Sequence, residues 1–274
     1  MSTSLPVQSS PVTLAPGEAR ARIGWVDGAS AVLAQQARTP AKLLAPYARG
    51  PAVWLCHLTF GGGVVAGDQL DMAVDVEAAA SVLLSTQGAS KVYKDPQAQG
   101  SRQGMTGRIA DGALLAHVPH PLTAYAGAHY RQESLYHCQP GGSCCWWECV
   151  SAGRPDQGEH WHASHLHLAT TLQVGETVLV RDRISLQGDD LRAQLAQWRC
   201  MFTLGMYGPR CQEGVQALAQ GQAIDGCRIS VSPIADGCVV RGLARDVESA
   251  RAFCCAHSQW LIPQLGDDPW RSLL

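Results

Sequence analysis

The segment from Val53 to Tyr93 constrains the fold more than any other part of this chain. Apolar side chains alternate with acidic or small ones between Leu70 and Glu77. A period of two places the apolar set on one face of a β-strand, so a second layer must cover that face. The preceding run, Val53–Phe60, is apolar on both faces, which is typical of an interior strand. A third strand follows and breaks at Ser85-Thr86-Gln87-Gly88.

A glycine-rich turn, Gly61–Gly63 through Gly67, joins the first two of these strands. Glycine tolerates the positive φ angles that tight turns need. A phosphate-binding loop would require Lys and Ser/Thr after the last glycine and then a helix, whereas Asp68 and Gln69 stand there and a strand follows. The sequence therefore predicts a structural turn and excludes nucleotide binding at this position.

Further short strands are predicted along most of the chain. Asp27-Gly28 marks a hairpin turn, and residues 41–50 are expected to form a loop. The last third predicts a short helix capped by Asp189-Asp190, helical turns near Val215 and Leu218, and a hairpin around Asp236-Gly237. A final helix would begin after Asp246 and end at Pro263. The predicted strands are 20–37 (a hairpin), 104–109, 113–118, 129–137, 143–152, 161–174, 177–186, 229–231 and 239–243.

These patterns favour a mainly β fold of stacked or sandwiched β-sheets, β-helix-like, with a few α-helices near the C-terminus. Residues 1–19 are rich in Pro and Ser and are expected to be disordered, which leaves residues 20–274 as a single domain.

Composition narrows the possible partners and compartments. Charged residues make up 16% of the chain and the net charge is −2, which argues against nucleic acid or an anionic membrane as a partner. No signal peptide or apolar run of membrane-spanning length is visible. The eleven cysteines are odd in number, and no C-x-x-C occurs, so reduced thiols in the cytoplasm are expected rather than disulfides or a structural zinc site.

Several short motifs resemble those of the urease accessory protein family UreD, also called UreH. Gly62 to Asp68 is similar to its GG-x-x-x-GD turn, and Ser85 to Tyr93 to its TT-x-x-x-T/S-K-x-Y segment; Ser85 stands where the family usually has Thr. The similarity is clear from about Trp25 to Leu186. The matching residues are Gly62, Gly63, Gly67, Asp68, Thr86, Lys91, Tyr93, Pro119, Gly127, Ala128, Trp147, Glu148, Gly153, Arg154, Gly158, Glu159, Asp182 and Arg183.

The resemblance implies a maturation scaffold rather than an enzyme. Such a protein would bind the urease apoprotein on one side and UreF on the other, with the GTPase UreG recruited through UreF. It would help pass nickel to the urease active site and hold no permanent cofactor. The absence of G-x-S-x-G and H-E-x-x-H motifs from the sequence is in line with a non-catalytic role.

Seven residues are candidate transient nickel ligands on this hypothesis. Imidazole and carboxylate groups both suit nickel, and dispersed ligands would let the ion move on. In a strand, His165 and His167 would share one face, and His160 and His162 would also share a face. An alternative is a nickel- or zinc-binding storage or sensing module built on His160–His167. The seven candidates are Asp68, Glu148, Glu159, His160, His162, His165 and His167.

Structural roles remain open for each of these groups. The carboxylates could form a buried network with Arg154 that fixes strand register. The four histidines could simply line an exposed strand face. His57, His117 and His120 are expected to be hydrogen-bonded core residues. Cys145 and Cys149 would share a strand face, either within reach of a thiophilic metal or as small buried hydrophobes.

Overall fold

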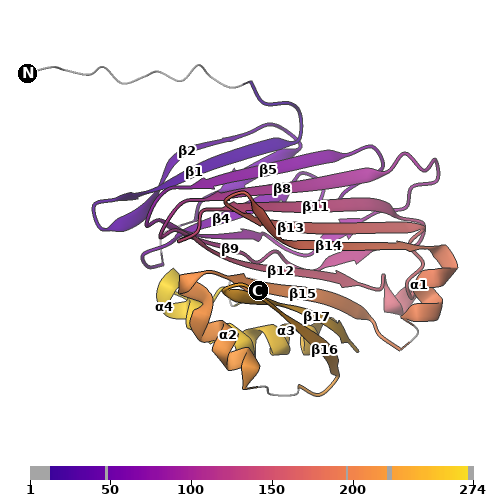
Figure 1. The fold of residues 1–274 in the computed structure, drawn as a ribbon. Coiled ribbons are helices and arrows are strands. Elements are labelled where there is room, and N and C mark those ends of the chain that lie inside the picture. The colour runs from indigo at the N-terminus through magenta and orange to yellow at the C-terminus, as the bar shows by residue number, and fades with distance from the viewer. Residues whose placement is uncertain (1–12, 47–48, 196, 221–223, 271–274) are drawn as a thin grey trace, which may run out of the picture.

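Two large β-sheets face each other in the computed structural model, which describes residues 13–46, 49–195, 197–220 and 224–270 (Figure 1). The first sheet has the strand order β14-β13-β11-β8-β5-β1-β2. It consists of β1 (Glu18–Val26), β2 (Ala29–Ala37), β5 (Gln69–Val76), β8 (Ser101–Ile109), β11 (His129–Cys138), β13 (His165–Val174) and β14 (Thr177–Gln187).

The second sheet has the order β16-β17-β15-β12-β9-β6-β4-β3, with β10 and β7 attached beside β12. Its members are β3 (Ala41–Leu44), β4 (Val53–Thr59), β6 (Ser81–Thr86), β7 (Ser90–Val92), β9 (Leu114–His117), β10 (Leu122–Ala124), β12 (Ser143–Ser151), β15 (Cys200–Tyr207), β16 (Cys227–Ile234) and β17 (Gly237–Ala244).

The chain winds between the two sheets as a β-helix does. From β4 to β13 the longer strands fall alternately in the second and the first sheet, and within each sheet they pair in parallel. Turns at one corner stack on each other, since Ala79 N donates to Asp111 O and Gly112 N to Gly141 O, at 3.3 and 3.0 Å. The predicted mainly β, β-helix-like fold is confirmed.

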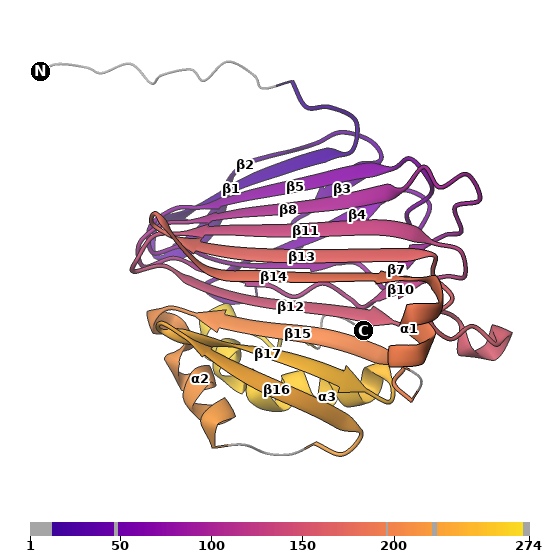
Figure 2. The same ribbon diagram turned by 45° about the vertical axis from the view of Figure 1, so that its right-hand side comes forward.

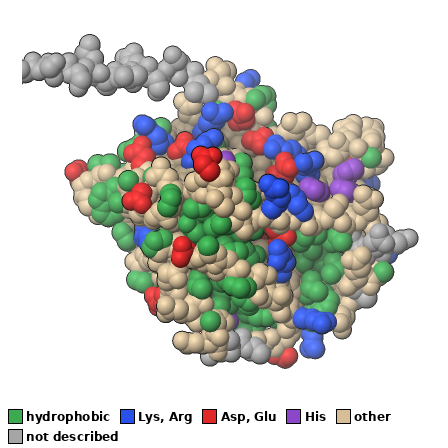
Figure 3. Space-filling view, viewed as in Figure 1, with side chains coloured by type: hydrophobic (Ala, Val, Ile, Leu, Met, Phe, Trp, Pro, Cys, Tyr) green, Lys and Arg blue, Asp and Glu red, His purple; other side chains and the backbone are tan. Residues whose placement is uncertain are grey.

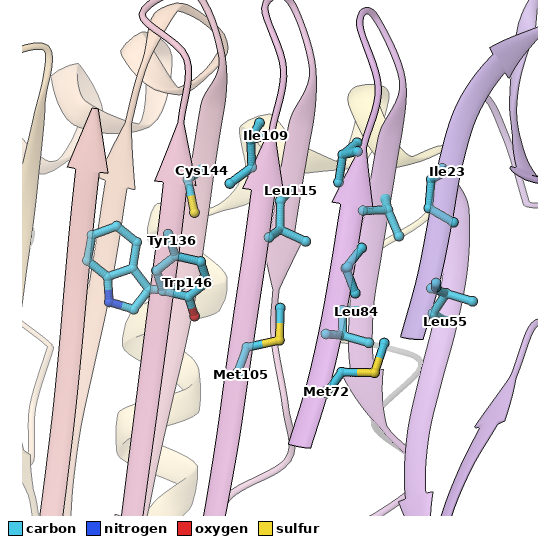
Figure 4. Close-up of a cluster of buried hydrophobic side chains, with 14 of the residues drawn as sticks. Ile23, Leu55, Met72, Leu84, Met105, Ile109, Leu115, Tyr136, Cys144 and Trp146 are labelled. Carbon is cyan, nitrogen blue, oxygen red and sulfur yellow. The ribbon is translucent and has the colours of Figure 1, made fainter. Parts of the chain in front are cut away.

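The main core fills the space between the sheets, as the alternation in β5 predicts. Leu70, Met72, Val74 and Val76 are all buried, whereas the residues between them are partly exposed. Trp146 of β12 stacks on Tyr136 of β11 with ring centres 5.5 Å apart, so the two sheets contact through aromatic side chains (Figure 4). Burial of this continuous apolar set is the main force that holds the sheets together.

Helices cover the outer face of the second sheet near its β15–β17 end (Figures 1 and 2). Phe253 packs on Phe202, and Trp147 meets Trp270 edge to face. Asp246 caps its helix as predicted, because its carboxylate accepts the Ser249 amide at 2.7 Å. The covering helices are α2 (Gln212–Ala219), α3 (Val247–His257) and α4 (Ile262–Leu265), whereas α1 (Gly188–Gln194) follows β14 of the first sheet. None of the described helices is long and apolar enough to cross a membrane.

Several predicted boundaries need correction. The expected loop at residues 41–50 contains β3, a strand of four residues that is too short for its alternation to be recognised. Strand β13 begins at His165 rather than Trp161, which has a positive φ of 55°. The last long helix ends at His257, and Pro263 instead lies in the first turn of α4, where its missing N–H is harmless.

Two further predictions concern the N-terminal segment and the cap of α1. Residues 1–12 lie outside the described residues, but Glu18 and Ala19 belong to β1, where Ala19 is buried and pairs with Met72. That partner explains why the last part of the segment expected to be disordered is held in a strand. The side chains of Asp189 and Asp190, predicted to cap α1, lie outside the described ones.

Candidate functional site

Glu148 lies in the middle of β12 with its side chain between the two sheets. Every residue of this strand is buried, and Glu148 itself is 9% exposed. Its Oε1 accepts hydrogen bonds from Ser134 Oγ at 2.7 Å and Gln132 Nε2 at 3.2 Å, both on β11. Its Oε2 accepts one from Thr170 Oγ1 of β13 at 2.9 Å. The carboxylate therefore joins the second sheet to the first.

Burial dominates the electrostatics of this carboxylate. It raises the pKa of Glu148 above the usual value, and the hydrogen bonds from Ser134, Thr170 and Gln132 oppose that shift only in part. The negative charge of Asp182 adds to the rise. A buried carboxylate needs such donors, because an unpaired charge in the interior costs several kcal/mol, on the order of the whole stability of a domain.

Two cavities meet at Glu148. One is a cleft of about 410 Å³ that lies between β14 of the first sheet and β15–β17 of the second, lined by Val150, Asp182 and Arg241 among others. Figure 3 shows hydrophobic side chains gathered over this region. The other is an interior cavity of about 70 Å³ on the side of β4, β6 and β8. Glu148 lines both, so its carboxyl group stands where one space gives way to the next.

A third space of about 260 Å³ continues the series towards the glycine turn. It shares His57, Thr86 and Ser90 with the interior cavity and is also lined by Gly62 and Gly63. The three spaces follow one another through shared lining residues across the space between the sheets. Polar groups that line them in succession are Asp182, Glu148, His117 and His57.

Two of the imidazoles that line these spaces are held neutral. Burial lowers the pKa of His57 to about 4, and burial together with the charge of His57 lowers that of His117 to about 3. His117 Nδ1 lies 2.8 Å from the Tyr136 hydroxyl, and His120 Nδ1 lies 2.8 Å from Thr86 O, so both are hydrogen-bonded as predicted. The prediction is wrong for His57 Nε2, a buried nitrogen with no hydrogen-bond partner among the described residues. A neutral imidazole can offer a lone pair to a metal ion.

The GG-x-x-x-GD turn has a structural role, as its sequence predicts. Asp68 Oδ2 accepts the Val65 amide at 2.9 Å, and Gly61, Gly62 and Gly67 have positive φ angles. A Cβ on Gly63 would lie 2.5 Å from the Tyr93 ring and 2.7 Å from Lys91 O, so only glycine fits. The turn and the segment containing Lys91 and Tyr93 are thus one contact, which explains why both motifs occur together.

The Gly153–Glu159 loop is closed by an ion pair. Arg154 Nε donates to Glu159 Oε1 at 3.1 Å, and the Arg154 backbone amide donates to Oε2 at 3.0 Å. The guanidinium also lies over the Tyr125 ring, 4.2 Å from its centre. The Arg154 hydrogen bond lowers the pKa of Glu159 below its usual value. Glu159 therefore holds a loop rather than lining any of the three spaces described above.

Removing this ion pair is expected to loosen the loop in a pH-dependent way. A carboxyl whose pKa is depressed on folding stabilises the folded state above its unfolded pKa, and that contribution is lost as pH falls through the folded value. We therefore expect Glu159→Gln to speed proteolytic cleavage between Gly153 and Gly158 at pH 7 and to have a smaller effect at pH 4, below the usual glutamate pKa of 4.5. Limited proteolysis at both pH values measures this, with the exposed Glu176→Gln as the control. Equal cleavage of variant and parent at pH 7 would contradict the role.

The predicted histidine row is divided by the structure. His160 and His162 precede β13 in a loop, where the His160 amide donates to His162 Nδ1 at 2.8 Å, so they do not share a strand face. His165 and His167 do share one, with parallel rings whose centres are 6.5 Å apart. Among the described residues, no three or more His, Cys, Asp or Glu side chains are arranged to hold a metal ion.

The cysteines behave as small apolar groups. Cys145 and Cys149 face the helices on the same side of β12, and Cys149 Sγ lies 3.0 Å from Cys200 Sγ. Burial raises the pKa of both Cys145 and Cys149 well above the usual range, which keeps the thiols protonated and poor as metal ligands. All eleven cysteines are free in the structure.

Sequence reasoning missed the three donors to Glu148. Gln132, Ser134 and Thr170 stand at positions of β11 and β13 that point between the sheets. Polar residues at inward positions of otherwise apolar strands are the signal that could have identified them. The pairing of Asp182 with Arg241, at 2.9 Å, was also not anticipated, because it joins β14 to β17 across the cleft.

Comparison with known proteins identifies the family. Residues 15–272 match the family described as UreD urease accessory protein. The chain is 33% identical over 268 residues to a urease accessory protein UreD of Anaeromyxobacter sp. (strain Fw109-5), which covers 94% of this chain and 90% of the relative. It is 32% identical over 241 residues to that of Sorangium cellulosum (85% and 77%) and 32% identical over 170 residues to urease accessory protein D of Oryza sativa subsp. indica (61% and 56%). The chain belongs to the UreD urease accessory protein family.

Proposed function

We propose that this protein is a urease maturation scaffold that binds apo-urease and UreF, recruits UreG through UreF, and passes nickel between them through the space between its sheets. The family match supports a role in urease maturation. The observation that carries the nickel route is the position of Glu148, a carboxylate in the common wall of two successive cavities. Nickel is the cargo here, not a resident cofactor.

Weak and dispersed ligands are what transfer of an ion requires. A site with three or four converging ligands would hold nickel tightly and release it slowly, whereas a series of single ligands lets an ion bind and leave. Asp182, Glu148, His117 and His57 line the route one after another, and the described residues form no multi-ligand cage. The two imidazoles are neutral at pH 7, so they do not repel the cation.

The proposed route uses only part of the ligand set expected from the sequence. Glu148 lies on it, but Asp68 and Glu159 make local hydrogen bonds that shape their own loops. We therefore leave Asp68 and Glu159 out of the route, together with His160 and His162. A storage module built on His160–His167 loses its physical basis, because these four imidazoles do not line one strand.

Exposed apolar residues mark both ends of the route. Phe60 and Val65, 59% and 51% exposed, flank the glycine turn that lines the third space. Ile229 and Val231 are exposed on β16, and Ile229 lines the cleft at the other end. Large exposed apolar side chains near a polar opening are suited to contacts with protein partners. A scaffold that connects two partners needs one such surface at each end.

Co-purification with separate partners tests this arrangement. We expect Phe60→Asp/Val65→Asp to lose one partner of the pair UreF and apo-urease, and Ile229→Asp/Val231→Asp to lose the other, each by at least about tenfold in affinity (roughly 1.4 kcal/mol). Tagged chain co-expressed with UreF, UreG and apo-urease provides the measurement. Val178→Asp, on exposed β14, is the matched control. Retention of both partners by both double variants would overturn the two-ended arrangement.

A further inference from the structure

Histidine side chains gather at one end of the outer face of the first sheet (Figure 3). His129 is the first residue of β11 and His165 the first of β13, and the two are direct partners in this parallel pair. Tyr130 and Leu166, the next residues in each strand, are fully buried between the sheets. His129 and His165 therefore point outward, on the opposite side of the sheet from the cavities described above.

The two rings have the separation that a shared metal ion needs. Their centres are 4.8 Å apart and their planes are inclined by 48°. An imidazole nitrogen binds Zn²⁺ at about 2.0–2.1 Å, which places each ring centre roughly 3.2 Å from the ion. At ligand–metal–ligand angles between about 90° and 110°, two such ring centres lie about 4.5–5.2 Å apart. The observed separation falls within this interval without any movement of the strands.

We propose that His129 and His165 form a partly exposed, exchangeable site for a borderline divalent cation such as Ni²⁺ or Zn²⁺, with water in the remaining coordination positions. Imidazole is a ligand suited to both ions. The two imidazoles lie side by side, and the described residues hold no group of three or more potential metal ligands. The site is independent of the route between the sheets, since its side chains lie on the other face of β11 and β13.

Neighbouring groups favour an open imidazole pair. The His167 ring is parallel to that of His165 with centres 6.5 Å apart, so we place it outside the site. The nearest cationic side chain on β11, Arg131, donates to Glu133 at 2.6 Å, and Glu133 also pairs with Arg102. On β14, the uncharged Gln187 is the register partner of His165.

Nickel titration of single variants tests the site. The purified full chain would be titrated with NiCl₂ by calorimetry, alongside His129→Gln, His165→Gln and the matched control His167→Gln. We expect each of the first two variants to weaken one class of site by at least about tenfold, because each removes half of the protein ligands. The His167 variant, which changes the same face of the same strand, should bind as the parent does. Glu148→Gln should also leave this site unchanged.

A spectroscopic measurement distinguishes the pair from other ligands. With Cu²⁺ as the probe, electron spin resonance should show two imidazole nitrogens in the parent and one in either the His129 or the His165 variant. Unchanged nickel affinity in both variants would overturn the proposal, and so would an equal loss in the His167 control. Circular dichroism of each variant confirms that the fold is retained, which is expected because all three positions are on the outer face.

Discussion

Replacing Glu148 by Gln is expected to reduce urease activation by at least about tenfold while the protein still binds its partners. Gln has the same shape, and its carbonyl oxygen can still accept from Ser134 Oγ and Gln132 Nε2. The change removes only the negative charge that attracts a divalent cation, in the wall that two cavities share. Loss of a group that directs metal binding commonly lowers metal affinity or activity about 10–100-fold. Urease activity and nickel content in cells grown at limiting nickel measure the effect.

The stability of the same variant separates nickel transfer from a purely structural role. Because the folded pKa of Glu148 is raised, its charged form opposes folding at neutral pH, and this opposition disappears as pH falls through the raised value. We therefore expect Glu148→Gln to unfold at no lower urea concentration than the parent at pH 7. If the carboxylate served only to fix strand register, the variant would be destabilised and would activate urease in proportion to the folded fraction.

Two control variants separate the effect of the Glu148 charge from that of its hydrogen bonds and from that of another carboxylate. Thr170→Val removes one hydrogen bond to Oε2 but leaves the charge in place. Glu133→Gln removes a carboxylate from the outer face of the first sheet, where Arg131 and Arg102 neutralise it. Both should activate urease within about twofold of the parent, since neither removes a charge from the route. Normal activation by the Glu148 variant, with partners still bound, would end the proposed route through this residue.

Local sequence patterns predicted most strands but not their partners. The alternation in β5 predicted its buried face, and Asp27-Gly28 and Asp236-Gly237 each mark a real turn, as predicted. β15 was missed, although its eight residues are all buried, because a short run of this kind resembles a buried helix segment as much as a strand. A period of two tells which residues share a face, but it does not tell which strand lies beside which.

The candidate site was harder to predict than the strands, because its residues are far apart in the sequence and meet only in the folded protein. The Trp147-Glu148 motif drew attention to the carboxylate, but its donors come from β11 and β13 of the other sheet. The cleft exists because β14 and β16 are free sheet edges that lie near one another, which no local pattern encodes. Likewise, His129 and His165 are far apart in sequence and meet only through the register of a parallel strand pair.

Close packing beside Glu148 predicts a second large effect, on stability. Gly205 of β15 is the register partner of Trp146, the fully buried residue two positions before Glu148. A Cβ at Gly205 would lie 2.0–2.3 Å from three atoms of the Trp146 ring, a distance at which something must move. Trp146 cannot retreat easily, because its other side stacks on Tyr136. We expect Gly205→Ala to destabilise the fold by about 2–4 kcal/mol, around the upper end of what is typical for overpacked cores.

The origin of that destabilisation can be tested by making room for the added methyl group. Trp146→Phe alone should destabilise the protein because it leaves a gap, but combined with Gly205→Ala the two changes should be much less harmful than their sum. Gly88→Ala, where nothing lies within 4 Å of the new Cβ, is the matched control and should change stability by less than about 0.5 kcal/mol. Urea unfolding of the four variants gives the change in the free energy of unfolding for each of them. Strict additivity of the two changes would mean that Gly205 is required for some reason other than the Trp146 ring. Strong coupling would show that Trp146 can lie against β15 only because residue 205 lacks a side chain. The tryptophan in that position holds β12 and the carboxylate of Glu148 in place.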